Sequence, residues 1–303
     1  MTGRPPTRGL YAAAAILLAL SVGVQVVRDR GWQPYEPTNP LLWLRPGLPV
    51  KRLSLGYSNL AADLYWMRAV VYYGGKRLGE EKGRDFELLA PLLELATTLD
   101  TRFKVAYRFG AIFLTEAYPS GPARPDLAIA LLQRAMAANP GTWEYPHDIG
   151  FVYYWWLQDY KKAAEWFERA GDMPGAAVWL KPLAATTLAQ GGDRASSRLL
   201  WNKILETSDV EWFSKSAKMR LAQLDAMDQI DALNLAVDRY TAQQGHPPRS
   251  VQELAAAEGM RAVPADPTGA PFVLNPGSGR IELARRSRLW PLPQETRPGV
   301  PQP

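Results

Sequence analysis

Cysteine is absent from this chain of 303 residues. Its absence excludes disulfide bonds, cysteine-ligated zinc, lipid attachment at cysteine and catalysis by a thiol. It fits an oxidising compartment without establishing one. Histidine is almost absent as well, since only His147 and His246 occur. They lie far apart in the sequence, so no pair of histidines is available for a metal site.

The common enzyme motifs are also missing. The sequence has no Walker A loop, no G-x-G-x-x-G, no H-E-x-x-H and no G-x-S-x-G. Gly74-Gly75-Lys76 lacks the spacing and the Ser or Thr of a phosphate loop, and no nucleophile stands near His147. We therefore predict no catalytic residue, no cofactor, no metal ligand and no enzyme activity. An envelope hydrolase remains an alternative class without a catalytic group to support it.

What the chain does have is an ordinary globular balance of residues with many large rings. Hydrophobic residues make up 47% and charged residues 21%, with 11 Trp and 13 Tyr, so these rings must fill a core or line a surface. The net charge of +5 lies largely near the termini. We expect it to act toward a membrane surface or a partner, and no nucleic-acid motif favours DNA or RNA.

The N-terminal segment, residues 1–30, contains an uncharged run at residues 10–27. As a helix this run would be roughly 27 Å long, enough to cross the hydrocarbon core of a bilayer. Arg4 and Arg8 precede it, as in a signal anchor. We expect a single-pass protein of a bacterial-type inner membrane with most of the chain in the periplasm. A cleaved signal or a buried helix are the alternatives, and residues 31–52 read as a Pro-rich linker.

The centre of the chain repeats a helical pattern. Residues 143–174 carry Ile149-Gly150-x-x-Tyr153 and then Ala163-x-x-x-Phe167. Equivalent small or apolar positions lie 39, 35 and 34 residues apart, at Ala96, Ala135, Ala170 and Ile204. This order and spacing resemble the tetratricopeptide repeat (TPR), whose period is about 34 residues.

The resemblance implies an all-α fold, a TPR-type α-solenoid of about four helical hairpins over residues 53–208. It places several apolar residues in the core between paired helices. The expected aromatic core residues are Phe109, Phe113, Tyr153, Phe167 and Trp201. In the first hairpin, Leu60-Ala61-x-x-Leu64 matches the repeat pattern.

The resemblance also implies a concave groove lined by the first helix of each hairpin. The residues that project into it are Lys104, Tyr107, His147, Phe151, Tyr154, Trp155 and Trp179, together with Tyr65 and Trp66 on the first hairpin. Such rings suit an extended peptide or an apolar helix of a partner protein. Lys104 alone does not make a clamp for a terminal carboxylate. Alternatively, the chain's own C-terminal helix fills the groove.

Residues 209–245 form a long helical pattern after the repeats. Asp225, Asp228 and Asp231 are three apart on one side of it. Without a glycine-turn loop we interpret them as a solvated helix face rather than a cation site.

Residues 246–290 change in character. Ser250 begins a capping box for a short helix that ends at Gly259, and residues 272–274 and 281–283 read as a β-hairpin. The matching residues Tyr240, Gly245, Pro247, Leu254, Pro264, Asp266, Pro267, Gly269, Pro271 and Phe272 resemble the C-terminal region of type II secretion major pseudopilins. The N-terminus lacks a pilin processing site, so only a pilin-like tail is implied. Residues 291–303 are expected to be disordered.

Together these features predict a membrane-anchored scaffold that holds a protein or peptide partner in an aromatic groove. The pilin-like tail suggests an envelope, pilus or secretion assembly. The sequence does not indicate the partner or the oligomeric state.

Overall fold

The computed structural model describes residues 16–27, 51, 54–79, 85–207 and 210–296. The chain divides into two units, residues 1–45 and 46–303, and each is considered by itself. In the first unit, residues 16–27 form a helix. The start of the expected anchor, residues 10–15, and nearly all of the linker at 31–52 lie outside the described residues. Within the described ranges, no helix has both the length and the apolar character needed to cross a membrane.

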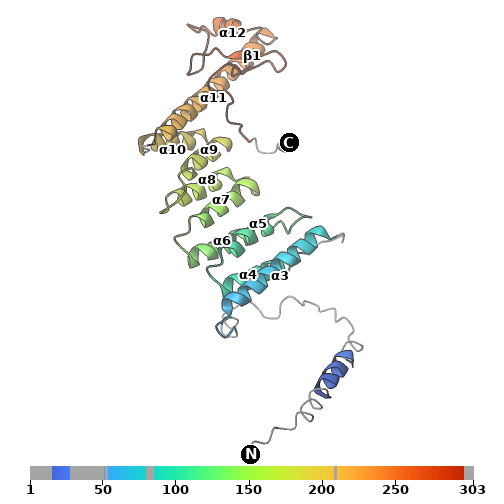
Figure 1. Ribbon diagram of the computed structural model, residues 1–303. Coiled ribbons are helices and arrows are strands. Elements are labelled where there is room, and N and C mark those ends of the chain that lie inside the picture. Colours follow the sequence, from blue (N-terminus) through green and yellow to red (C-terminus); the bar gives the residue numbers. More distant parts are fainter. Residues whose placement is uncertain (1–15, 28–50, 52–53, 80–84, 208–209, 297–303) are drawn as a thin grey trace, which may run out of the picture. The chain divides into compact units, whose positions relative to one another are not determined.

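The second unit is mostly helical, which confirms the all-α class (Figure 1). In chain order its elements are α3 (Ser58–Leu78), α4 (Leu89–Leu99), α5 (Lys104–Thr115), α6 (Pro125–Ala138), α7 (Glu144–Trp155), α8 (Tyr160–Gly171), α9 (Leu180–Gln190), α10 (Arg194–Thr207), α11 (Glu211–Gln244), α12 (Val251–Ala257), β1 (Val273–Asn275) and β2 (Arg280–Glu282).

Helices α3 to α10 pair in sequence as hairpins, and the hairpins stack. Helix α3 packs on α4, α5 on α6, α7 on α8 and α9 on α10. The second helix of each pair then packs on the first helix of the next (Figure 1). Helix α11 packs against α10 and so continues the stack.

Glycine permits the close approach within a hairpin. A Cβ atom at Gly150 of α7 would lie 2.6 Å from ring carbons of Phe167 on α8. At Gly110 of α5 it would lie 3.1 Å from the side chain of Leu131 on α6, and 2.8 Å from that of Leu93 on α4 of the preceding hairpin. These distances are shorter than ordinary van der Waals contact, so a larger residue displaces the opposing side chains or the helices.

The first hairpin departs from the expected register. Leu60 and Leu64 match the repeat pattern of Ile149 and Tyr153, yet their exposed fractions are 58% and 51%. Helix α3 instead buries Ala62, Ala69 and two tyrosines, so the repeat pattern does not mark its inward face. Together with Met67 and Val71, the two leucines form an exposed apolar stripe along α3.

The C-terminal elements follow the sequence closely. Helix α11 ends at Gly245, which has a left-handed φ of 77°. The Ser250 side chain accepts a hydrogen bond from the Glu253 amide at 3.1 Å and caps α12, as expected. The two strands pair antiparallel but begin one residue from the predicted positions, with Leu274 opposite Ile281.

The three aspartates of α11 lie on an exposed face, as expected, and they also form ion pairs with α10 that the sequence did not indicate. Arg194 of α10 contacts Asp228 at 2.8 Å and Asp231 at 2.6 Å. Arg198 contacts Asp225 at 3.0 Å and Asp228 at 2.7 Å. These ion pairs connect α11 to the last hairpin, which is formed by α9 and α10.

Residues 289–296, which we call the strap, return from the tail to the stack. The Gln223 amide donates to the carbonyls of Leu289 and Pro291, both at 2.9 Å. Glu295 pairs with Arg194, and the Thr296 amide donates to the Gln190 carbonyl at 2.8 Å. The expectation of disorder was therefore wrong for residues 291–296. These hydrogen bonds and the ion pair hold the segment in place although it has few apolar residues to bury. Residues 297–303 lie outside the described part.

Acid should weaken the contact between α10 and α11. Burial by itself raises the pKa of Asp228, but hydrogen bonds from Arg194 and Arg198 more than offset it, so the pKa lies below its ordinary value. The stabilisation is therefore present above the ordinary Asp pKa of about 4 and is lost as the pH falls through the lower folded value. We expect wild type to unfold at higher urea concentration than Asp228→Asn at about pH 6 and the difference to close near pH 3. A difference that stays constant across this range contradicts the assignment.

Candidate functional site

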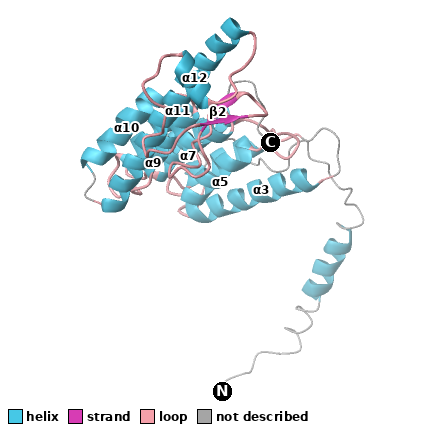
Figure 2. Ribbon diagram, turned by 90° about the horizontal axis from the view of Figure 1, so that it is seen from above, coloured by secondary structure: helices cyan, strands magenta, loops and turns pink. Residues whose placement is uncertain are grey.

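The first helices of consecutive hairpins form one face of the stack. Helices α5, α7 and α9 follow one another in both views (Figures 1 and 2). The structure places most of the expected groove residues on this face, on α7 and beside it.

The aromatic residues of α7 lie next to each other. Phe151 and Trp155 are 48% and 61% exposed, and their near-parallel rings are 6.4 Å apart. Tyr154 is half-buried, with its ring 6.2 Å from that of Trp155. Its hydroxyl donates to Oε1 of Gln190 on α9 at 2.7 Å. These three side chains form the aromatic surface of the groove.

His147 and Trp179 lie together at the other end of α7. The His147 ring packs 5.5 Å from Trp179 and 5.7 Å from Phe167, which leaves the imidazole mostly covered. Trp179 remains 45% exposed. His147 therefore packs beneath the aromatic residues of the groove and contributes little exposed surface to it.

Tyr107 is not a groove residue, which corrects the prediction. It is only 3% exposed, and its hydroxyl donates to the Thr97 carbonyl at 3.3 Å. Burial raises its pKa, so it stays a neutral donor. Helix α5 is turned about its axis relative to α7, which buries Tyr107 and leaves Phe109 51% exposed. Phe109 was expected in the core and instead joins the groove.

Other expected residues are spread between core and rim. Phe167 and Trp201 are buried, as expected, whereas Phe113 and Tyr153 are half-buried. Tyr65 is buried and is not part of the groove. Trp66 is half-buried and stacks on Phe113 at 5.8 Å.

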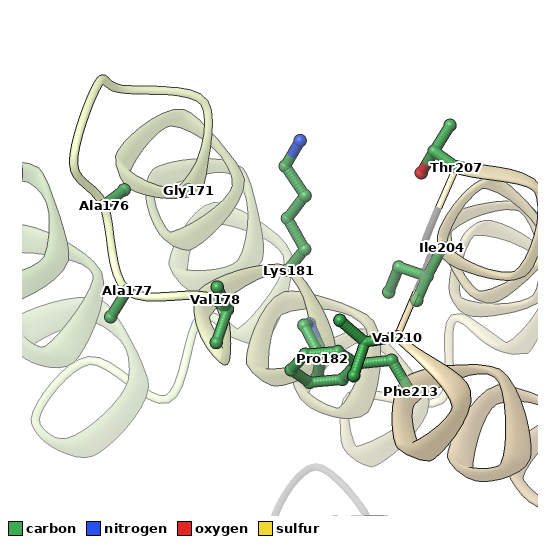
Figure 3. Close-up of a pocket in the computed structure, with 10 residues that line it drawn as sticks. All are labelled: Gly171, Ala176, Ala177, Val178, Lys181, Pro182, Ile204, Thr207, Val210 and Phe213. Atoms are coloured by element: carbon green, nitrogen blue, oxygen red, sulfur yellow. The ribbon is translucent and has the colours of Figure 1, made fainter.

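A cleft of ≈ 360 Å³ lies where α8, α9, α10 and α11 meet (Figure 3). It is lined by small apolar residues with Pro182, Val210 and Phe213 (Figure 3). Its one lining amine, Lys181, pairs with Asp172 at 2.8 Å. The hydroxyl of Thr207, which also lines the cleft, donates to the Lys203 carbonyl at 2.7 Å, so these polar groups are already engaged within the protein.

A cleft of ≈ 410 Å³ between α5 and α7 is the candidate site. It is lined by Arg108, Phe109, Ala111, Ile112, Thr115, His147, Asp148, Phe151, Val152, Trp155 and Trp156. Several of these residues were missed by sequence reasoning, including Ile112, which is 53% exposed. The sequence of α5 would indicate Ile112 as a cleft residue only if the rotation of that helix about its own axis were already known.

The charged groups beside this cleft are already paired. Arg108 binds Asp148 through two bonds of 2.5 and 2.9 Å, and these bonds raise the pKa of Arg108. His147 Nδ1 lies 2.9 Å from the same carboxylate. One helical turn away, Lys104 pairs with Glu144, so Lys104 is an exposed rim residue that is already neutralised. The cleft thus presents apolar rings with little net charge.

In the part of the chain that the structure describes, no group of three or more His, Asp or Glu side chains is placed to hold a metal ion. No protein-family model matches the chain, and no curated protein or solved structure matches it. The resemblances to TPR proteins and to pseudopilins remain hypotheses from the sequence.

Proposed function

We propose that this chain is a TPR-type scaffold that binds an apolar segment of a partner protein on the face formed by α5 and α7. The observation that carries the proposal is the cleft with Phe109, Ile112, Phe151 and Trp155 exposed along it. Large rings exposed beside one another are the usual anchors of a binding surface. Because Lys104 and Arg108 are paired, an anionic ligand gains little there.

We propose binding rather than catalysis. The ionisable groups at the cleft, Arg108, Asp148 and His147, contact one another. The Thr115 hydroxyl donates to the Ala111 carbonyl at 3.1 Å. These groups are held as structure, which supports a non-enzymatic role.

The cellular setting is part of the same proposal. Residues 10–27 would anchor the chain in a bacterial-type inner membrane, with the repeats in the periplasm and the partner in an envelope, pilus or secretion assembly. Its support is the apolar run and the pilin-like pattern around Asp266. Occupation of the groove by α11 is not favoured, because α11 packs against α10.

Trp155→Ala should weaken binding about tenfold or more, because it removes the most exposed ring of the cleft. The probe is a phage-displayed library of random dodecapeptides, panned against the full chain in detergent. Trp212→Ala is the matched control, since Trp212 on α11 is similarly exposed at 67%. Selected peptides should lose affinity for the first variant only. Peptides that bind both variants as tightly as wild type would overturn the proposal.

A further inference from the structure

The strap ends beside the aromatic groove. Its last described residue, Thr296, donates its amide to the carbonyl of Gln190 at 2.8 Å. Gln190 is the last residue of α9, and its side chain accepts the hydroxyl of Tyr154 at 2.7 Å. Tyr154 in turn lies beside Phe151 and Trp155, with ring centroids 6.3 and 6.2 Å away. One residue of α9 thus joins the strap to the groove.

The strap is held along its length by side chains of α10 and α11. Arg194 binds both oxygens of Glu295, and Gln223 holds the carbonyls of Leu289 and Pro291. Leu292 packs against the apolar residues shared by α9, α10 and α11. These contacts bring the last described residue of the strap, Thr296, to the C-terminal end of α9, beside Tyr154.

Residues 297–303 read Arg-Pro-Gly-Val-Pro-Gln-Pro. Proline at 298, 301 and 303 disfavours helix and sheet and favours the polyproline II conformation. With three residues per turn, Pro298 and Pro301 fall on the same side. At about 3.1 Å per residue the seven residues reach about 22 Å, which is enough to run over a short helix such as α7.

The composition of this segment matches the surface. Polyproline II segments bind to grooves lined by aromatic side chains, with little ordering entropy to lose. Arg297 is the one charged side chain of the segment, and the charged groups beside the cleft are already paired. The guanidinium of Arg297 would also gain a favourable cation–π interaction beside the rings of Tyr154 and Trp155.

We propose that residues 297–303 bind within the same molecule, as a polyproline II segment, over Phe151, Tyr154 and Trp155. The proposal deepens the proposed function and rests on it: it names the ligand class of the groove, an extended Pro-x-x-Pro segment of low charge. A partner must then displace the chain's own segment to bind.

The absence of cysteine allows a direct test. A single Cys in Gln302→Cys, labelled with the fluorophore bimane, reports contact with tryptophan because an indole in contact quenches it. We expect quenching in the full chain in detergent that is released by Trp155→Phe and unchanged by Trp212→Phe. Pro298→Ala with Pro301→Ala should release it too. Absence of Trp155-dependent quenching overturns the proposal. Quenching that grows with protein concentration also overturns it, because the occupant is then a second copy.

A second measurement separates this proposal from the proposed function. The peptide Thr-Arg-Pro-Gly-Val-Pro-Gln-Pro, residues 296–303, should bind a chain ending at Thr296 at least tenfold more tightly than the full chain. Equal binding to both chains contradicts occupation by residues 297–303. If library peptides still depend on Trp155 in that case, the groove function stands and only the internal ligand fails. If neither kind of peptide depends on Trp155, the groove function fails as well.

Discussion

Phe167→Ala is expected to lower the free energy of unfolding by about 3–5 kcal/mol. The Phe167 ring is 1% exposed and fills the space between α7 and α8, where Gly150 brings the two backbones together. Alanine would leave a cavity that cannot collapse, because Ala163 and Ile149 around it are also completely buried. In a stacked array each hairpin stabilises its neighbours, so the loss should spread to α5–α6 and α9–α10.

Thermal unfolding followed by circular dichroism at 222 nm measures this effect. Phe151→Ala is the matched control, since it removes the same ring from the same hairpin at a position 48% exposed. We expect a much smaller shift for this control. Equal shifts for the two variants would show that Phe167 is not the centre of the core.

Asp266→Ala should destabilise the C-terminal elements by about 3 kcal/mol. The Asp266 carboxylate is 4% exposed and accepts bonds from the amides of Thr268 and Ala270, the Thr268 hydroxyl and the Ser287 hydroxyl. Burial alone raises the pKa of Asp266, but these donors hold it below its ordinary value. Alanine leaves the donors buried without an acceptor, and that cost exceeds the loss of the bonds themselves.

Hydrogen exchange resolved by segment should detect this change. Amides of β1 and β2 are expected to exchange faster in Asp266→Ala, while α7 and α8 keep their protection. Asp63→Ala, at an exposed position of α3, serves as the control. Unchanged exchange in both strands contradicts a central role for the carboxylate.

The sequence predicted the helical hairpins because small residues recur where helices must approach. Gly110 and Gly150 mark these places, and a Cβ atom at either would clash with the opposing helix. The C-terminal turns were also predictable, since Ser250 and Gly245 act through local hydrogen bonds and backbone angles.

The rotation of individual helices was not predictable in the same way. Helix α3 is apolar on more than one side, so its periodicity does not show that Tyr65 is buried while Leu60 and Leu64 are exposed. On helix α5 the repeat pattern placed Phe109 in the core and Tyr107 in the groove, whereas contacts with Thr97 and Tyr145 hold Tyr107 in the core. The sequence therefore indicated the exposed rings of α7, Phe151 and Trp155, but not those of α5.

The strap was missed for a different reason. Pro-rich, polar sequences usually bury too little apolar area to offset the loss of conformational entropy on ordering. Here the order comes from Arg194 and Gln223, whose partners are separated from them by many residues. Bonds between such distant residues leave no periodic signal.

The apolar stripe on α3 makes the two ends of the stack unequal. Helix α11 closes one end with paired charges, including Arg198 with Asp225 and Asp228. At the other end Leu60, Leu64 and Met67 face outward, and covering them would gain about 25 cal/mol for each Å² of apolar surface. The stack therefore differs along its length: an apolar surface that packs on the outward side of α3 would be stabilised by covering these residues.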